Sequence, residues 1–495
     1  MEHKKYIYKA IILVGIIALM AGISSCEDFL DLKPLSFDNV DNFYKSETDF
    51  EQAVNATYNR FRSAYAMHYI FGDLRADNTT MVGPGQIDDT PEYKWIDVFD
   101  NLHASNYRLA PHWPSTYRVI QAANGILDNI EKVDFNQARK DQFKGEALTF
   151  RAMSYFRLAR MWGGVPIVLN ADVNIDESFS TPRASLDDVY KLIIDDLTNA
   201  IPLLPVSYSG NDIGRISRGT ARTLLGQVYL TRHNFSGAAE QFGEVINSNV
   251  YSLLPNYEDN FAPGAGGNKE AIWQLLYNAG HNQGSTFPRW MAPRNSSGIV
   301  VEPGSTFAFN QPSMELINAY EEGDLRKDVS IGMGFTNLQG NWVLAPYIKL
   351  YTQHEMKTGG SDCHFNIFRY GHLLLMQAEA LNETNNGPNA QAYAYVNQIR
   401  QRAGLPDLPA GLSQSQFRDA VYREQRFEVA FEGHRWFDLL RTGRALEVMN
   451  SKVTFDEMET VGPYRPVQEY ELLFPIPQDV IDRSHPGVIK QNPGW

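Results

Sequence analysis

The chain has little cysteine, no long hydrophobic run after its N-terminus and no excess of positive charge. Its 495 residues include two cysteines, Cys26 and Cys363. If Cys26 is modified, neither an intrachain disulfide nor a cysteine metal site can form. No later segment approaches the roughly eighteen apolar residues that a membrane-spanning helix needs. The 44 Lys+Arg against 58 Asp+Glu give a net charge of −14, which argues against nucleic acid as a ligand.

The rest of the composition is that of a globular protein. Hydrophobic residues make up 43% and charged residues 21%, which excludes a disordered chain, a coiled-coil rod and a collagen-like fibre. The length corresponds to roughly three average domains, so the chain can bury a large core without disulfides. Aromatic residues are frequent, with 25 Tyr and 8 Trp, and their flat rings offer many surfaces for stacking.

The first residues are typical of an export signal. Lys4 and Lys5 precede the apolar run from Ala10 to Ala21, and small residues lead directly to Cys26. This pattern resembles the cleavage box of bacterial lipoproteins, so we expect residues 1–25 to be a signal peptide and Cys26 to carry the lipid. An ordinary signal peptide with an incidental cysteine is the alternative. The acidic residues after Cys26 resemble the surface-export signal of Bacteroidetes lipoproteins, although a solvated linker has the same composition.

Helical periodicity dominates residues 50–250. Apolar residues recur every three or four positions in 50–61, 116–130, 142–161 and 186–201. The segment 220–248 also matches the tetratricopeptide spacing, in which small residues let two antiparallel helices approach closely. The residues that carry this match are Leu225, Gly226, Tyr229, Ala238 and Phe242. Weaker copies begin at Ala147 and Leu374, so the sequence predicts a mostly α-helical scaffold of stacked helix pairs.

The periodicity fails between about residues 250 and 365, where Gly, Pro, Asn and Ser are dense. Tryptophans and other aromatics are also frequent there, which is unlike a disordered segment. We therefore expect an ordered, loop-rich layer at 251–365, between an N-terminal helical part at 26–250 and a C-terminal part at 366–495. A second loop-rich stretch is expected at residues 72–100.

Five sequence blocks together resemble the SusD/RagB family of Bacteroidetes outer-membrane lipoproteins. They occur in the order typical of that family and span the mature chain, at residues 26–34, 151–166, 369–380, 422–441 and 473–477 with 491–495. Two details depart from the family pattern: Arg423-Glu-Gln-Arg426 stands where Glu and Arg are usually adjacent, and Gly371-His372 stands where Ala-Glu is usual.

The resemblance implies a SusD-like fold and a function. Members of the family sit at the cell surface, bind oligo- or polysaccharide, and act as the lid of a SusC-like TonB-dependent transporter in the outer membrane. They are not enzymes and need no cofactor, and the loop-rich side carries the ligand. A RagB-like minority captures peptides instead. A structural Ca²⁺ held by carbonyl-rich loops is a further expectation, although no EF-hand loop is present.

Ligand-binding residues are expected in the loops. An indole face can pack against the C–H face of a sugar while neighbouring polar groups meet its hydroxyls. The candidates for stacking are Trp95, Trp290 and Trp342, and the candidates for hydrogen bonding are Asp73, Arg75, Asp77, Asn78 and Arg369. The alternative is structural: Asp73 and Asp77 hold their loop through Asx turns, and Arg369 caps a helix or pairs with a carboxylate.

Two other functions remain as alternatives. Glu424, Glu428 and Glu432 recur every four residues and could suggest a glycosidase, but catalytic carboxylates flank a bond from opposite sides, whereas these share one helix face. An ion-paired structural face is the preferred interpretation. A scaffold that binds only protein through its helix pairs is the other alternative. The acidic net charge argues against strongly anionic glycans, unless Arg289 and Arg294 form a local basic patch.

Overall fold

The computed structural model describes residues 43–81, 91–172, 175–452 and 463–495. The chain divides into a short unit, Met1–Lys45, and a compact unit, Ser46–Trp495. The predicted signal peptide and Cys26 lie outside the described residues. The helices and strands that position the candidate functional residues all belong to the compact unit.

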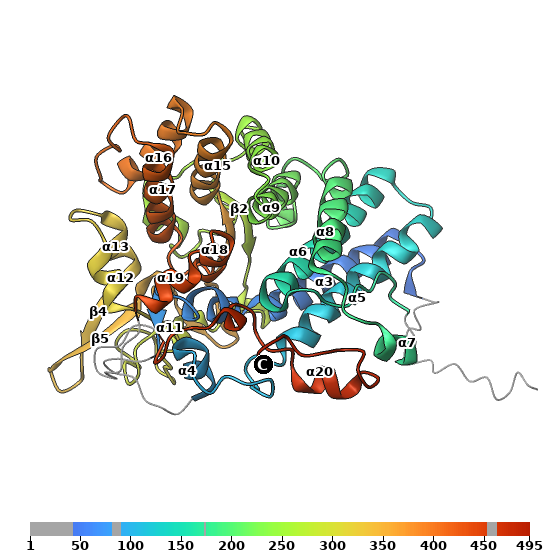
Figure 1. The fold of residues 1–495 in the computed structure, drawn as a ribbon, viewed down its shortest axis with the longest axis horizontal. Coiled ribbons are helices and arrows are strands. Elements are labelled where there is room, and N and C mark those ends of the chain that lie inside the picture. The colour runs from blue at the N-terminus through green and yellow to red at the C-terminus, as the bar shows by residue number, and fades with distance from the viewer. Residues whose placement is uncertain (1–42, 82–90, 173–174, 453–462) are drawn as a thin grey trace, which may run out of the picture. The chain divides into compact units, whose positions relative to one another are not determined.

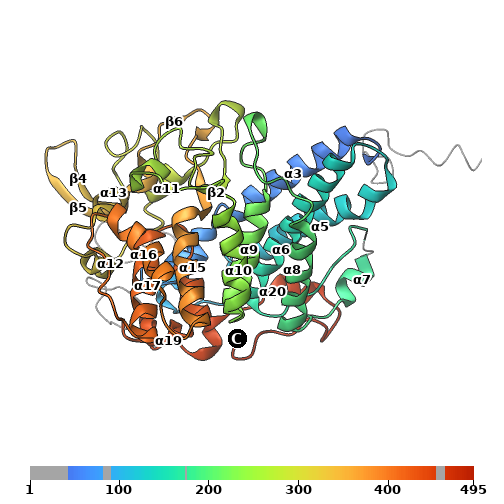
Figure 2. The same cartoon turned by 90° about the horizontal axis from the view of Figure 1, so that it is seen from above.

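Long helices form a row in which each packs against the next (Figures 1 and 2). Contacts run from α3 through α5, α6, α8, α9 and α10 to α15, which packs against both α16 and α17. This arrangement confirms the predicted mostly α-helical scaffold of helix pairs. The helices of the row are α3 (Glu47–Tyr65), α5 (His112–Asn129), α6 (Gln137–Trp162), α8 (Leu186–Ala200), α9 (Arg218–Thr231), α10 (Phe235–Asn247), α15 (Tyr370–Thr384), α16 (Ala390–Arg402) and α17 (Gln414–Glu428).

Local sequence explains where these helices begin and end. Ser185 is the N-cap of α8, because its side chain accepts a hydrogen bond from the backbone N–H of Asp188. At the start of α9, Ser217 and Thr220 form a reciprocal capping box. Helix α6 ends at Gly163, whose φ of 79° suits a residue without a Cβ. The buried face of α3 includes Phe50, Val54 and Phe61, the predicted apolar stripe.

The residues of the tetratricopeptide signature lie where α9 and α10 pack closely together. A Cβ placed on Gly226 would lie 2.4 Å from the Phe242 ring, and both Ala238 and Phe242 are fully buried. The small residue at position 226 therefore makes room for the ring, as the sequence pattern indicates. The predicted pairs α6–α8 and α15–α16 are also present.

Replacing Gly226 by alanine is expected to destabilise the protein by about 1–3 kcal/mol, because the added methyl displaces the buried Phe242 ring. The matched control is Gly243→Ala on α10, where the nearest atom to a new Cβ is 3.7 Å away. That variant should be neutral or gain up to about 1 kcal/mol from helix propensity. Urea unfolding of both variants measures the difference, and equal midpoints would contradict the packing argument.

A loop-rich layer with short helices and strands lies beside the α15–α17 end of the row (Figure 2). It contains four two-stranded antiparallel pairs, β1–β3, β2–β8, β4–β5 and β6–β7. The strands are β1 (Thr79–Thr80), β2 (Ala271–Leu275), β3 (Gln311–Pro312), β4 (Ile331–Thr336), β5 (Trp342–Ile348), β6 (Met356–Lys357), β7 (Gly360–Ser361) and β8 (Phe365–Arg369). Trp273 on β2 is buried, as expected for a short core strand.

The remaining helices are short. They are α4 (Pro91–Val98), α7 (Ile175–Ser180), α11 (Phe287–Met291), α12 (Met314–Ala319), α13 (Leu325–Ser330), α14 (Lys349–Thr352), α18 (Arg435–Arg441), α19 (Ala445–Asn450) and α20 (Gln478–Arg483). The C-terminal segment packs back onto α6, where the Trp162 indole N–H donates to the Pro475 carbonyl at 3.0 Å. Trp113, Trp162 and Trp436 are buried in the core.

Candidate functional site

Four of the predicted polar ligand residues lie in the segment that follows α3, and each is at most 1% exposed. The Asp73 carboxylate accepts from the Gly433 backbone N–H at 2.9 Å. Arg75 donates to the carbonyls of Ile96 and Glu471 at 3.0 and 2.9 Å. The structure thus gives Asp73 and Arg75 structural partners, and their side chains are closed off from solvent.

Asp77 and Asn78 bind arginines from the C-terminal part of the chain. Asp77 contacts Arg435 at 2.7 Å and Arg426 at 3.0 Å, while Asn78 accepts from Arg426 at 2.7 Å. Burial raises the pKa of Asp77, but the guanidinium groups of Arg435 and Arg426 lower it by a larger amount. The pKa of Asp77 therefore lies well below the usual range of an aspartate. These side chains therefore hold the loop in place instead of facing a ligand. They do so through long-range bonds and not through the Asx turns named above as the alternative.

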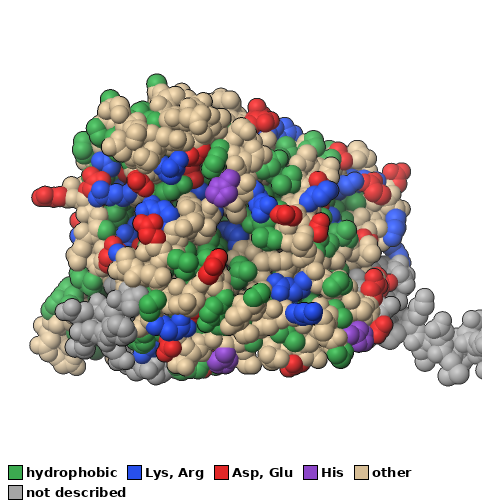
Figure 3. Space-filling view, viewed as in Figure 1, with side chains coloured by type: hydrophobic (Ala, Val, Ile, Leu, Met, Phe, Trp, Pro, Cys, Tyr) green, Lys and Arg blue, Asp and Glu red, His purple; other side chains and the backbone are tan. Residues whose placement is uncertain are grey.

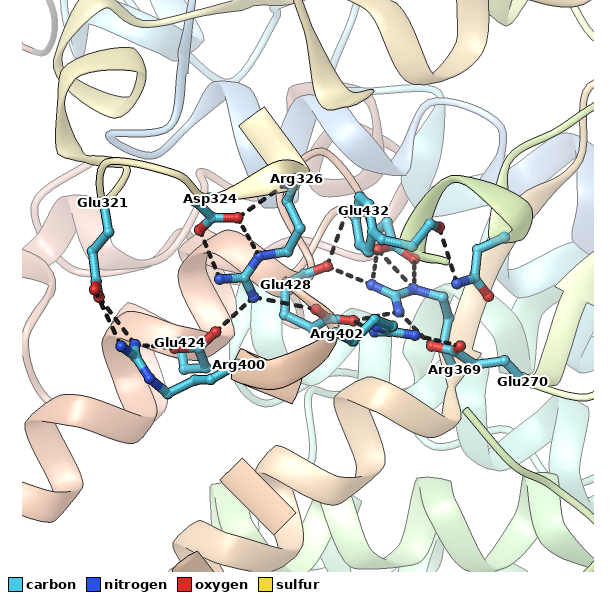
Figure 4. A network of polar contacts seen from close by, with 12 residues as sticks. Glu270, Glu321, Asp324, Arg326, Arg369, Arg400, Arg402, Glu424, Glu428 and Glu432 are labelled. Atoms are coloured by element: carbon cyan, nitrogen blue, oxygen red, sulfur yellow. Dashed lines mark hydrogen bonds and ion pairs between the residues drawn. The ribbon is translucent and has the colours of Figure 1, made fainter. Parts of the chain in front are cut away.

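Arg369, the fifth predicted polar residue, belongs to a buried ion-pair network (Figure 4). Its guanidinium contacts Glu270 at 2.9 Å, Glu428 at 2.7 Å and Glu432 at 2.7 Å. Because the side chain is 1% exposed and ion-paired, it corresponds to the carboxylate-pairing alternative rather than to a ligand contact at the surface.

The three glutamates of the predicted ion-paired face belong to the same network (Figure 4). Glu424 contacts Arg326 at 2.6 Å and Arg400 at 3.1 Å, and Glu428 also contacts Arg402. The partners come from α13, α16 and β8 instead of from neighbouring arginines on α17. Burial raises the pKa of Glu428, but Arg402, Arg369 and Arg326 lower it by a larger amount, so that the pKa is about 2.

These pairings leave the glutamates unsuited to glycosidic cleavage. A general acid needs access to the scissile bond, whereas Glu424, Glu428 and Glu432 are all buried and paired with arginines, and Glu428 is also held ionised. The ion pairs of all three glutamates are thereby confirmed, but the shared helix face is not, because α17 ends at Glu428 and Glu432 lies beyond it.

The three predicted tryptophans lie on three different elements. Trp95 on α4 is half-buried, with its ring centroid 5.5 Å from that of His103. Trp342 opens β5 and is 62% exposed, near the exposed Leu338, Leu344 and Met333 of the β4–β5 hairpin. Trp290 on α11 is half-buried and lines a cavity. Trp290 is therefore the predicted residue with the clearest place in a binding site.

The cavity beside Trp290, called here the Trp290 cavity, has a volume of about 290 Å³. Helix α3 contributes Asn59, Arg62 and Ser63 to its lining. The loop between β2 and α11 contributes Tyr277, Asn282, Gln283, Ser285 and Thr286, and α11 adds Phe287 and Trp290. Among these lining residues there is no carboxylate, histidine or cysteine, so the cavity offers aromatic surface, neutral hydrogen-bonding groups and the guanidinium of Arg62.

Arg62 organises the polar side of this cavity. Its guanidinium donates to the Asn59 amide oxygen at 2.7 Å, to Gln283 Oε1 at 3.3 Å and to the Leu276 carbonyl at 3.3 Å. It also lies 5.5 Å from the Tyr277 ring centroid. These contacts orient two exposed amide side chains around the opening, an arrangement suited to hydroxyl groups of a ligand.

Sequence reasoning missed Asn59, Arg62, Tyr277 and Gln283. A signal for the α3 residues was present, because Asn55, Asn59 and Arg62 recur on the helix face that the apolar stripe leaves exposed. The loop after β2 carries no comparable pattern, since its approach to α3 depends on the pairing of β2 with β8.

Neither the surface charge nor a metal-binding group adds much to the description of the Trp290 cavity. On the face seen in Figure 3, basic and acidic side chains are interspersed rather than segregated. Within the described ranges, no group of three or more His, Cys, Asp or Glu is arranged to hold a metal. The helices in those ranges are also too short or too polar to cross a membrane.

Comparison with known proteins places the fold and the site in context. One family model, described as the SusD family, matches residues 335–495, and another, described as starch-binding associating with outer membrane, matches residues 28–230. SusD-like protein P25 of Formosa agariphila is 26% identical, with 93% of this chain and 94% of that protein covered.

Solved structures agree over nearly the whole chain. A laminarin-binding SusD-like protein is 25% identical with a TM-score of 0.76, covering 91% of this chain and 100% of its own. Surface glycan-binding protein A of Bacteroides thetaiotaomicron, solved with laminarihexaose, has a TM-score of 0.75 at 20% identity, covering 90% of this chain and 99% of its own. The printed descriptions of both proteins name glycan binding.

The helix-pair scaffold, the five sequence blocks and these matches at both ends of the chain agree: the protein is a member of the SusD/RagB family.

Proposed function

We propose that this protein captures oligo- or polysaccharide at the cell surface and delivers it to a SusC-like TonB-dependent transporter in the outer membrane. The matched proteins described as binding starch, laminarin or laminarihexaose support the ligand class. The family resemblance supports the transporter as partner. No covalent chemistry is required, since capture and release are both binding steps.

The Trp290 cavity is the observation that carries this proposal. A sugar ring has apolar C–H faces and a rim of hydroxyl groups, so it needs an aromatic surface beside neutral donors and acceptors. Trp290 offers the aromatic surface, and Asn59, Gln283 and Arg62 offer the polar groups. Trp95 and Trp342 remain proposed as additional stacking surfaces outside this cavity.

The proposed anchor is a lipid on Cys26 after removal of residues 1–25. Acyl chains hold a folded domain at a membrane without a spanning helix. The outer-membrane association in the description of the matched family model supports this location. The mature protein would then face the cell surface, where it meets polymeric nutrients and can close over its transporter.

Replacing Trp290 by alanine is expected to weaken glycan binding by about tenfold or more, equivalent to roughly 1.4 kcal/mol, because the stacking surface is lost. The soluble chain that begins after Cys26 is screened against polysaccharides and a protein digest, and calorimetry measures each affinity. Tyr107→Ala is the matched control, since Tyr107 is 54% exposed and does not line the cavity. Trp95→Ala and Trp342→Ala test the other two predicted surfaces.

The same screen separates the alternatives. Binding to peptides alone would favour the RagB-like function. Release of reducing sugar would indicate a glycosidase and contradict the absence of catalysis. Intact glycan binding in all three tryptophan variants would show that the ligand site lies elsewhere on the protein.

A further inference from the structure

A second cavity adjoins the Trp290 cavity on the same side of α3. It has a volume of about 480 Å³, and we call it the Arg215 cavity. Asn59, Arg62 and Gln283 line both cavities, so the two meet at these three side chains. The Arg215 cavity extends from there along α3 towards Glu51 and along residues 211–215.

Both cavities follow one face of α3. Their lining includes Glu51, Asn55, Asn59, Arg62 and Ala66, which are spaced by four, four, three and four residues. This spacing keeps all five on one face of an α-helix. At a rise of 1.5 Å per residue, the stretch from residue 51 to residue 66 is about 22 Å long. The two cavities therefore form an elongated groove, called here the α3 groove.

The charges in the Arg215 cavity are already paired. Asp212 contacts Arg215 at 2.8 Å, and Glu51 contacts Arg139 at 2.9 Å. Arg215 also binds the buried Glu146 at 2.9 Å and donates to the Asn55 amide oxygen at 3.0 Å. Because each carboxylate in this cavity is paired with an arginine, what the cavity presents to a ligand is mainly amide groups, which suit the hydroxyls of an uncharged chain.

Arg62 stands where the two cavities meet. Within the described part of the chain it has no carboxylate partner, and its three hydrogen bonds leave two of its five N–H donors unused. A half-buried guanidinium held in place by two amides can donate to hydroxyl or ring oxygens on either side.

We infer that a neutral, linear oligosaccharide lies lengthwise in the α3 groove, with sugar units in both cavities and Arg62 donating to the chain between them. This inference rests on the proposed glycan binding and names the ligand class and the direction in which the ligand lies. Trp290 stacks on one part of the chain, and Asn55, Asn59 and Gln283 meet the hydroxyls along it.

Chain length and position-specific variants test the inference. The probes are laminarin, starch, xylan and mannan, each with its disaccharide and hexasaccharide, and calorimetry on the mature chain measures affinity. The hexasaccharide that binds is expected to do so at least tenfold more tightly than its disaccharide. Arg62→Gln should weaken hexasaccharide binding at least tenfold. Asn55→Ala should weaken it about threefold and leave the disaccharide that occupies the Trp290 cavity unaffected.

Matched controls lie on the same helix. Arg60 and Gln52 are exposed on α3 and line neither cavity, so Arg60→Gln and Gln52→Ala should bind like the unmodified protein. Thermal unfolding of every variant distinguishes a lost contact from a lost fold.

Each contrary result has a distinct meaning. Equal affinities for disaccharide and hexasaccharide, or hexasaccharide binding that survives both Arg62→Gln and Asn55→Ala, would overturn the lengthwise site and leave glycan capture standing. Tighter binding of polygalacturonate than of every neutral probe would overturn the neutral class. If the unmodified protein binds no glycan, the proposed function and this inference both fail.

Discussion

Replacing Arg369 by methionine is expected to destabilise the protein by about 3–5 kcal/mol, because its removal leaves buried carboxylates without their cation. Glu432 is affected most, since Arg369 is the cation it contacts within the described residues. Glu428 keeps Arg402 and Arg326. Urea unfolding followed by circular dichroism measures the loss.

The pH dependence of this loss distinguishes charge from packing. In the Arg369→Met variant, Glu432 can escape its unpaired charge by taking up a proton, so the deficit should shrink as the pH falls. The control is Arg483→Met, because Arg483 is 71% exposed and lies 3.9 Å from Asp479. Such a surface pair contributes at most about 1 kcal/mol. A deficit of that size at Arg369, or one that is independent of pH, would contradict the electrostatic role.

Replacing Asp97 by asparagine is expected to stabilise the protein at neutral and alkaline pH. Asp97 is buried at the end of α4 and accepts hydrogen bonds from the Met81 N–H at 2.7 Å and the Thr80 hydroxyl at 2.9 Å. Burial raises its pKa to about 7, an effect that these two bonds reduce without cancelling. An amide oxygen can accept the same bonds without the cost of burying a charge.

The sign of the pH dependence follows from the raised pKa. The folded protein binds the Asp97 proton more tightly than the unfolded chain does, so this group adds stability as the pH falls from about 7 towards 3.8 and costs stability above 7. The advantage of Asp97→Asn should reach up to about 4 kcal/mol at pH 8 and disappear near pH 4. Unfolding at several pH values measures it. The control is Asp195→Asn, at a side chain that is 54% exposed. Its difference in stability from the unmodified protein should not change between pH 4 and pH 8. A constant difference across this range would refute the electrostatic explanation.

The helical scaffold could be predicted from sequence because its signals are local. The stripe on α3, the Ser185 cap and the Gly226–Phe242 contact each depend on residues less than twenty positions apart. The short helices α11 to α14 and the β4–β5 hairpin were not predicted. Their segments are too short for a periodicity to emerge, and long-range pairing such as that of β2 with β8 fixes their surroundings.

The candidate site was only partly predictable for the same reason. Trp290 was found by its residue type, since an indole in a loop-rich segment is a natural stacking surface. Asp73, Asp77 and Arg369 also have residue types that suit a ligand, but their burial depends on partners far along the chain, such as Gly433, Arg435 and Glu432. A single sequence cannot distinguish a buried ion pair from a polar group that faces solvent.

The bonds that hold the segment after α3 have a consequence for the order of folding. The bond from Asp73 to Gly433 joins residues 360 positions apart, and the bond from Arg75 to Glu471 joins residues 396 apart. The early segment cannot reach its final surroundings until the end of the chain is available. Under the proposed export, a chain with these contacts would stay incompletely folded while it crosses the inner membrane, and would complete its core once the C-terminal residues have emerged.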